Sequence, residues 1–508
     1  MRLSKAWIII LSSLTVVVTV LPIIRFGLKG VFYTIDPDVQ YLSNSFSYIE
    51  KAQIQYDGHP GTPTIILLAY ALWPLRVYVR LATEMPFMTW VFQHADITYF
   101  YIRIFQSLWL GLAMAVFLWA ILRYTKSVAA CLFAWAGLFV YSIFPYLGST
   151  IVPETTSFFI TVVWLFIFSV SNKSISTIKV LFLAAISGLA SANKFSNITL
   201  VFLSFALVGF IPKVNIIQRL KILLGTILVT VVVFIISTWS IRNTYPNLFR
   251  WVSILATTTG THGGGEKSIF DLTAYLKSVS SLLHQDYWPA WITAATSVWL
   301  LVSIVKWKQK LITPLTIAFI IVMGGIIIFA KYPLSHYQLV NYTLVLFVAS
   351  ALLTRTSRLL AIVIPVVLLP MVFTNLSYYT QSSTKAMINT ARLEEYVRRH
   401  PASRGTLWEW ARVSDFSFLW GRDWAGGTFD KELSQYRPDL LAITSDMEKI
   451  KINNRELKEV FDVCWDKFYI QTVSAPVFMT KYADRSLKYS LLPGIEDISI
   501  IESDHCQK

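Results

Sequence analysis

Charged residues are scarce in this chain, and their scarcity excludes an ordinary soluble protein. Asp, Glu, Lys and Arg make up 14% of the 508 residues, whereas an average soluble domain has about 25%. Hydrophobic residues account for 55%. Apolar runs of roughly 17–22 residues recur along the first 380 residues, long enough to cross a hydrocarbon core of about 30 Å. The composition indicates a polytopic, mostly α-helical membrane protein.

A signal-peptide cleavage site is also lacking. The first apolar run, residues 6–24, follows Arg2 and Lys5, as a secretory signal would. It is longer than the roughly 7–15 residues of a signal-peptide core, and no Ala-x-Ala pattern follows it. We therefore expect an uncleaved first span.

Acidic residues are missing from six short segments that carry the basic residues of the predicted inner loops. Lys and Arg in short loops mark the cytoplasmic side of a membrane protein. The net charge of +15 is therefore a topology signal, and a nucleic-acid partner is not expected. The six segments contain Arg2/Lys5, Arg123/Lys126, Lys173/Lys179, Lys213/Arg219/Lys221, Lys306/Lys308/Lys310 and Arg355/Arg358.

Placing these segments inside predicts about eleven spans, with a cytoplasmic N-terminus and an extracytoplasmic C-terminal region in the plasma (inner) membrane. Residues 180–212 could instead form one tilted helix interrupted at 193–197. That alternative would put later basic loops outside, so we predict a hairpin with Lys194 at its outer tip. The predicted spans are 6–24, 101–122, 128–147, 155–171, 180–193, 196–212, 222–241, 289–305, 311–330, 337–353 and 359–379.

The predicted organisation is a transmembrane module, residues 1–380, followed by an extracytoplasmic domain, residues 381–508. Two loops of the module lie outside, at 25–100 and 242–288. Within the first, the apolar stretch 62–81 could span the membrane. Counting it as a span would reverse every later loop, so we place it along the membrane surface as an amphipathic helix.

The C-terminal region, about 125 residues long, is large enough for its own small core. Residues 440–444 and 473–480 have the pattern of strands, and 385–399 and 445–460 that of helices. A small α/β or α+β domain is expected. Cys464 and Cys506 lie here, and their spacing does not show whether they form a disulfide.

Acidic and His-containing motifs cluster in the outer loops. Asp36-Pro37-Asp38 follows the first span closely, and its carboxylates could hold a divalent cation or deprotonate a hydroxyl. An ordinary Asp-Pro-Asp turn is the alternative. His59-Pro60-Gly61-Thr62 leads into the surface helix, and Glu154 lies at an outer membrane boundary.

Five cationic or His side chains occupy the same outer boundary, on the wrong side of the charge rule. Arg and Lys there can bind a lipid phosphate, and snorkelling to phospholipid head groups is the alternative. Together, opposite two acidic loops, they favour an anionic lipid substrate. They are Arg103, Lys194, Arg242, Lys331 and His336.

The ordered set of motifs resembles the GT-C superfamily of glycosyltransferases, in its protein O-mannosyltransferase and aminoarabinose transferase branch. The family has Asp-Glu in the first loop and His-Pro-Pro-Leu before the surface helix. This chain departs from it with Asp-x-Asp and with Gly61. The resemblance covers roughly residues 1–350 and includes Asp36-Pro37-Asp38, His59-Pro60-Gly61-Thr62, Ser187-Gly188-Leu189-Ala190 to Lys194, Thr238-Trp239-Ser240-Ile241-Arg242-Asn243 and His336-Tyr337-Gln338-Leu339.

The resemblance implies transfer of a sugar from a polyprenyl-phosphate donor to a lipid, glycan or protein acceptor, with inversion. Asp36 would be the general base, and Arg103, Lys194 and Arg242 would bind the donor phosphate. His336 and Lys331 are further phosphate-binding candidates, and His59 a positioning residue. Asp38 and Glu154 would orient the acceptor or hold a divalent cation such as Mg, Mn or Zn.

Two other absences bear on this interpretation. The chain has no Gly-x-Gly-x-x-Gly after a strand and no Walker-type loop, which favours a lipid-linked donor over a nucleotide sugar. A transporter or flippase for a lipid-linked intermediate is the main alternative. The predicted span interiors are almost free of charge and no internal repeat is evident, which disfavours that alternative.

Overall fold

The structure of the chain is a computed structural model. It falls into two compact units. The helical unit contains Met1–Leu21, Asp57–Thr64 and Ile104–Tyr379; the second unit contains Pro22–Tyr56, Ile65–Arg103 and Thr380–Lys508. The residues that the structure describes are 2–25, 35–54, 61–170, 175–258, 266–268, 271–306, 313–332, 334–355, 358–399, 406–408, 429, 432, 435–436, 440–442, 467–472, 474–483, 487–492 and 495–503.

Each of the eleven predicted spans corresponds to a helix. Within the described residues, seven helices are long and apolar enough to cross a membrane, and five shorter apolar helices accompany them. The helix predicted to lie along the membrane surface within the first outer loop, α3 (Thr62–Ala82), is one of the seven by length and composition, so its placement along the surface stays a prediction. The helices that match predicted spans are α1 (Arg2–Arg25), α5 (Ala95–Thr125), α6 (Val128–Phe139), α7 (Pro153–Ser169), α8 (Thr177–Asn193), α9 (Thr199–Leu207), α10 (Ile216–Ser237), α13 (Tyr287–Lys306), α14 (Pro314–Phe329), α15 (Leu339–Leu353) and α16 (Arg358–Arg399).

The interruption between α8 and α9 is confirmed. Lys194 has an extended backbone, with φ −159° and ψ 133°, and the short 3-10 helix η2 (Phe195–Ile198) follows it. The Ala190 carbonyl at the end of α8 accepts two hydrogen bonds, from the backbone N–H of Lys194 at 3.0 Å and from the Asn197 side chain at 2.8 Å. The two helices therefore form a hairpin, as predicted.

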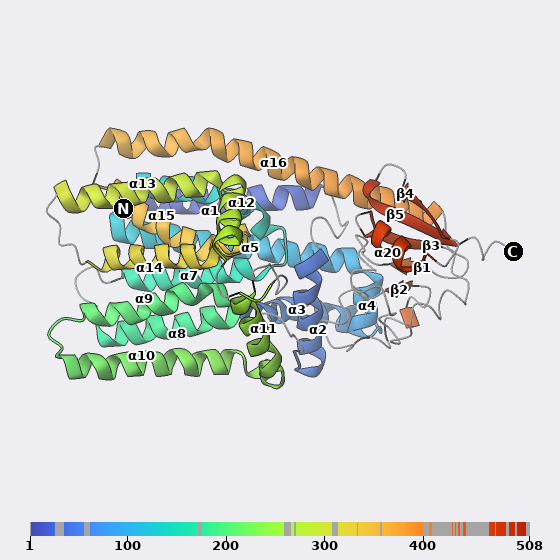
Figure 1. Cartoon of the computed structure of the whole chain (residues 1–508), viewed down its shortest axis with the longest axis horizontal. Coiled ribbons are helices and arrows are strands. Elements are labelled where there is room, and N and C mark those ends of the chain that lie inside the picture. The colour runs from blue at the N-terminus through green and yellow to red at the C-terminus, as the bar shows by residue number, and fades with distance from the viewer. Residues whose placement is uncertain are drawn as a thin grey trace. The chain divides into compact units, whose positions relative to one another are not determined.

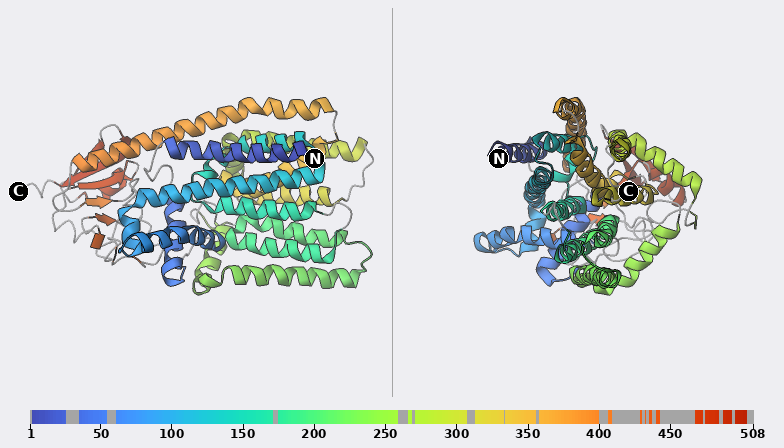
Figure 2. Two further views of the ribbon diagram at one scale, coloured as in Figure 1. Left: turned by 180° about the vertical axis from the view of Figure 1, so that it is seen from behind. Right: turned by 90° about the vertical axis from the view of Figure 1, so that its left-hand side faces the viewer.

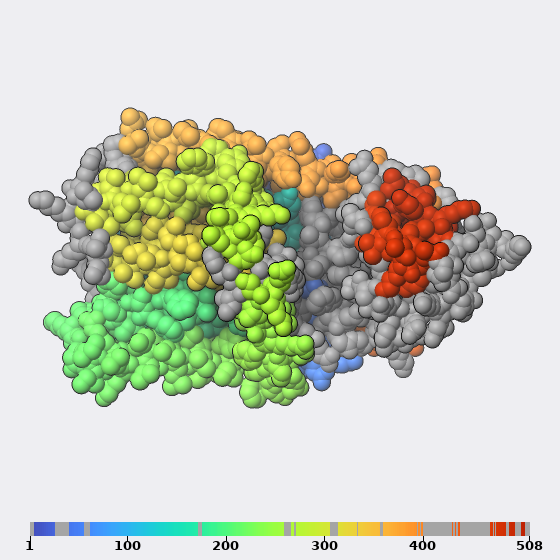
Figure 3. Space-filling model, in the orientation of Figure 1, coloured from blue at the N-terminus to red at the C-terminus, as the bar shows by residue number. Residues whose placement is uncertain are grey.

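Helix α15 lies at the centre of the helical unit, and all of its residues are buried. Gly325 of α14 allows a close approach there, because an added Cβ would lie 2.5 Å from Thr199 Oγ1 and 2.8 Å from Asn341 Oδ1. In contrast, α10 exposes many large apolar side chains, among them Leu224, Leu228 and Ile236. Figure 3 shows α10, α13 and α14 along one face of the unit. An apolar exposed face is what a lipid-facing helix requires.

Two amphipathic helices run across the long helices of this unit, as Figures 1 and 2 show. They are α11 (Tyr245–Thr257) and α12 (Leu272–Gln285). Asp271 caps α12, since its Oδ1 accepts a hydrogen bond of 3.0 Å from the backbone N–H of Ala274. The predicted outer loop 242–288 is therefore largely helical.

The second unit contains a mixed sheet within residues 381–508, where a small α/β or α+β domain was expected, and it also contains helices from the first 103 residues. Its helices include α2 (Ile35–Lys51) and α4 (Phe87–Gln93). The strand order is β2-β1-β3-β5-β4; β1 pairs in parallel with β2 and β3, and β5 pairs antiparallel with β3 and β4. The strands are β1 (Thr406–Trp408), β2 (Leu440–Ala442), β3 (Lys467–Gln471), β4 (Leu487–Leu492) and β5 (Ile495–Ser503).

The secondary structure predicted for the C-terminal region is partly right. Strand β2 lies within the predicted 440–444, and the predicted helix 385–399 is the last part of the 42-residue α16. The strand predicted at 473–480 is wrong, because α20 (Ala475–Lys481) forms there. Pro476 occupies its first turn, where the missing N–H has no helical partner to lose. Residues 445–460, Cys464 and Cys506 lie outside the described residues.

Candidate functional site

Three polar segments meet at one end of the helical unit. Helix α7 begins there with Pro153 and Glu154, and α8 ends there with Asn193 and Lys194. The third segment is the 3-10 helix η6 (Ser335–Gln338), which precedes α15. Each is a helix terminus, where backbone groups without helical partners create a polar environment.

A buried ion pair joins the first two segments. Lys194 Nζ contacts Glu154 Oε1, and the two side chains are only 5% and 6% exposed. The Lys194 ammonium also lies 4.5 Å from the centre of the Tyr337 ring. A charge taken out of water requires a partner of this kind, and an aromatic face adds a favourable cation–π contact. The structure thus places Lys194 and Glu154 in one buried charged cluster.

Asn193 fixes the position of this pair. Its Nδ2 donates to the carbonyl of Pro153 and to Ser157 Oγ, both at 2.8 Å. Its Oδ1 accepts from the backbone N–H and the hydroxyl of Thr64, at 3.2 and 2.7 Å. The N–H of Gly61 donates to the Asn193 carbonyl at 3.0 Å. Asn193 therefore ties α7, α8 and the start of α3 together.

Gly61 departs from the family's His-Pro-Pro pattern for a local reason. Its φ is 57°, in the left-handed region that glycine adopts easily. Proline holds φ near −65°, so it could not adopt this conformation. It also has no N–H and could not donate the hydrogen bond to the Asn193 carbonyl. Glycine at position 61 therefore allows the backbone to turn and to bond to Asn193 where α3 begins.

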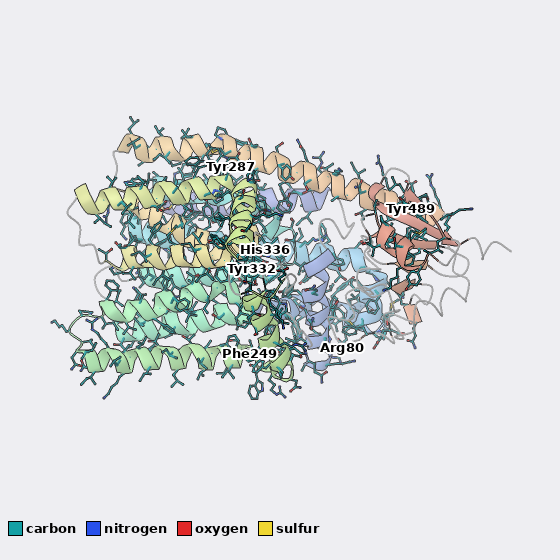
Figure 4. The ribbon with its side chains drawn as sticks, in the orientation of Figure 1. Arg80, Phe249, Tyr287, Tyr332, His336 and Tyr489 are labelled. Carbon is teal, nitrogen blue, oxygen red and sulfur yellow. The ribbon has the colours of Figure 1, made fainter. Side chains whose placement is uncertain are left out.

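Segment η6 brings a histidine to the ion pair. The His336 ring lies 4.4 Å from the Tyr337 ring, and His336 is close enough to Glu154 to interact with it electrostatically. The hydroxyl of Tyr141 donates to the carbonyl of Ser335 and holds η6 in place. Figure 4 shows His336 beside Tyr332 at this end of the unit. The structure therefore brings together three predicted site residues, Glu154, Lys194 and His336.

Arg242 and Lys331 have other contacts. Arg242 is exposed on η4 (Trp239–Thr244); its guanidinium lies 5.1 Å from the centre of the Trp239 ring, and its Nη1 donates to the Trp239 carbonyl at 3.2 Å. Lys331 donates to the carbonyls of Leu255 and Ala256, at 3.2 and 3.1 Å. These carbonyls end α11, where a cation is favourable. Lys331 thereby attaches α11 to the segment before η6.

The remaining predicted site residues lie in other parts of the chain. Arg103, in the second unit, is 1% exposed and has its guanidinium 5.3 Å from the Tyr99 ring centre. Asp36 and Asp38 occupy the first turn of α2, and the structure describes their backbone but not their side chains. His59 lies outside the described residues.

No metal-binding cluster of three or more His, Cys, Asp or Glu occurs within the described part of the chain. The Glu154 carboxylate is engaged by Lys194 there. The divalent cation suggested for Asp38 and Glu154 therefore stays a prediction.

Asp286 is a buried acid that was not among the predicted site residues. It lies between α12 and α13, and its Oδ1 accepts hydrogen bonds from the backbone N–H of Ser142 at 3.2 Å and from the Ser142 hydroxyl. The signal in the sequence was an acid directly after an amphipathic helix and before a span. Such a position is also usual for an exposed helix cap, so the pattern alone does not reveal burial.

The comparisons with known proteins agree with the predicted fold. No protein-family model matches the sequence, and no curated protein matches it. The structure is similar to the crystal structure of ArnT from Cupriavidus metallidurans bound to undecaprenyl phosphate. The TM-score is 0.55 at 12% sequence identity, and the alignment covers 98% of each chain. The chain therefore has an ArnT-like fold, the fold that the resemblance of its motifs implied.

Proposed function

We propose that this chain is a membrane glycosyltransferase that moves a sugar from a polyprenyl-phosphate donor to an acceptor. The buried Lys194–Glu154 pair, covered by Tyr337 and close to His336, carries the proposal. It lies at one end of a helical unit in a chain with the fold of ArnT, whose crystal structure contains undecaprenyl phosphate. A buried ammonium at a helix end suits an anionic lipid head group.

The donor phosphate would lie beside the Lys194 ammonium, which would then contact both the phosphate and Glu154. Lys binds phosphate as a point charge, and a buried site strengthens that attraction. His336 can add a hydrogen bond to the same group. Arg103, Arg242 and Lys331 stay further candidates for the phosphate, and His59 for positioning the substrates.

The proposed reaction is a single inverting displacement at the anomeric carbon of the donor sugar. Asp36 takes the proton of the acceptor hydroxyl as that oxygen forms its bond to the anomeric carbon. The bond between this carbon and the phosphate oxygen breaks, and polyprenyl phosphate leaves. Lys194 stabilises the negative charge that grows on the phosphate. Asp38 and Glu154 orient the acceptor or hold a divalent cation.

The transfer of labelled sugar from its carrier tests this function. The purified chain in lipid nanodiscs would receive undecaprenyl phosphate loaded with tritiated mannose or aminoarabinose, together with a membrane extract from the source organism as acceptor. We expect label to leave the carrier and bare undecaprenyl phosphate to accumulate. In sealed vesicles a flippase would instead move the intact donor between leaflets, and that result would replace the transferase by a transporter.

The proposed reaction takes place on the extracytoplasmic side, so α12 must face outward. Lys277 on α12 and Thr354 after α15 are both exposed and lie on opposite sides in the predicted topology. In a background with Cys464 and Cys506 changed to Ser, an impermeant thiol reagent added to intact cells should label Lys277→Cys and spare Thr354→Cys. Cell lysis should make Thr354→Cys reactive. Labelling of Thr354→Cys alone before lysis would invert the topology.

A further inference from the structure

Asp286 has one carboxylate oxygen that none of the described residues engages. The side chain is 7% exposed, and its Oδ1 is engaged by Ser142. Its other oxygen, Oδ2, is buried and has no hydrogen-bond partner among the described residues. A buried acceptor without a donor is costly, and native proteins rarely keep one without a reason. Ser142 holds the carboxylate in one orientation and leaves Oδ2 for another group.

Asp286 belongs to the same end of the helical unit as the buried ion pair. Tyr141, next to Ser142 in the chain, lies within electrostatic range of both Asp286 and Glu154. The Tyr141 hydroxyl also donates to the carbonyl of Ser335, which directly precedes His336. Lys194, which lies 4.5 Å from the centre of the Tyr337 ring, and Asp286 are therefore both close to the same segment, η6.

We propose that Asp286 Oδ2 accepts a hydrogen bond from the sugar of the donor, while Lys194 binds the phosphate. This inference rests on the proposed function and adds a sugar-recognition residue to it. An ionised carboxylate only accepts hydrogen bonds, and a sugar presents hydroxyl or ammonium groups that donate them. A buried polar group left unpaired by the wrong ligand discriminates strongly against that ligand.

Access to Oδ2 requires a small movement at the junction of α12 and α13. The oxygen lies below the water-accessible surface. None of the described residues of α12 is buried, and Tyr275 attaches this helix to α14 through one hydrogen bond to the carbonyl of Ile327, at 2.9 Å. The proposal therefore requires that α12 shifts about Asp286 when the donor binds, so that Oδ2 becomes accessible to the sugar.

Asp286→Asn tests the proposal, because Asn has the same size and can still accept from Ser142. We would measure binding of bare undecaprenyl phosphate, of the same carrier loaded with mannose, and of the carrier loaded with aminoarabinose. Asp286→Asn should bind the bare carrier as the wild type does, within about twofold. It should bind a loaded carrier about 10- to 100-fold more weakly, the effect of one charge-assisted hydrogen bond.

Ser142→Ala is the matched control, since it removes one bond to Oδ1 and keeps Oδ2. It should lower the thermal unfolding midpoint while the preference for loaded over bare carrier is retained. A loss confined to the aminoarabinose carrier would identify an ammonium as the donor, and a loss with both sugars a hydroxyl; either supports the proposal. Equal weakening of bare and loaded carriers, or no weakening of either loaded carrier, would overturn it. No binding of any carrier to the wild type would instead reject the proposed function.

Discussion

Lys194→Gln should weaken the binding of undecaprenyl phosphate by about 10- to 100-fold and slow sugar transfer at least as much. The variant removes the buried cation that is proposed to bind the phosphate. A hydrogen bond to a charged group contributes about 1.5–3 kcal/mol, which corresponds to this range of affinity. Transfer should suffer as well, because the charge on the phosphate grows as the sugar leaves. Equilibrium binding and single-turnover transfer would both be measured in nanodiscs.

The same substitution should also destabilise the protein, and this effect has to be separated from binding. Removing Lys194 leaves the Glu154 carboxylate, 6% exposed, without its partner. Breaking a buried ion pair in this way typically costs about 3–5 kcal/mol. The double variant Lys194→Gln/Glu154→Gln replaces the pair by two neutral amides. It should recover most of the thermal unfolding midpoint and still bind the carrier as weakly as Lys194→Gln does.

Lys179→Gln is a matched control for a buried lysine. Lys179 Nζ donates to the carbonyl of Phe168 at 2.6 Å near the end of α7 and lies 5.4 Å from the Phe168 ring centre. Its loss should lower stability and leave carrier binding unchanged. A double variant at Lys194 and Glu154 that folds and binds undecaprenyl phosphate as tightly as the wild type would remove Lys194 from the phosphate site.

The helices were predictable because membrane spans follow from hydropathy and loop charge, both of which are local properties. The hairpin at 193–197 also followed from the charge of the later loops, and α8 and α9 confirm it. A span of this kind can be predicted without knowing which helices pack against it. Its local composition is sufficient.

The side-chain partners were not predictable in the same way. Glu154 and Lys194 were both selected from their position at a membrane boundary, one as an acid and one as a phosphate ligand. Their pairing depends on how α7 and α8 pack, which Asn193 determines through contacts with residues far away in the sequence. Asp286 was not predicted for the same reason. Its burial depends on its contact with Ser142, which is far away in the sequence.

The C-terminal error has a different origin. Residues 473–480 contain Val473, Val477 and Phe478, whose types favour a strand. The structure instead forms α20, in which Phe478 is buried against Phe468 of β3, with ring centres 4.7 Å apart. Packing on the sheet therefore outweighs local propensity in this short segment, as it often does for isolated apolar runs.

Asp36→Asn should reduce sugar transfer by about 10²- to 10⁴-fold, the usual contribution of a general base, while carrier binding persists. Asn keeps the size of the side chain and its hydrogen-bonding capacity, but it cannot take the acceptor proton. Because an unperturbed carboxylate is a weak base at neutral pH, the proton transfer has to be concerted with the attack of the acceptor oxygen. Single-turnover transfer from loaded undecaprenyl phosphate would measure the chemical step apart from product release.

Asp38→Asn is the internal control, since both residues lie in the first turn of α2. If Asp36 is the base, Asp38→Asn should retain much more activity than Asp36→Asn and differ mainly in its acceptor or metal-ion dependence. Near-normal transfer by Asp36→Asn, together with an inactive Asp38→Asn, would assign the base to Asp38. Near-normal transfer by both variants would move the proton acceptor out of the first loop, and Glu154, the other predicted acid, would then be tested by Glu154→Gln.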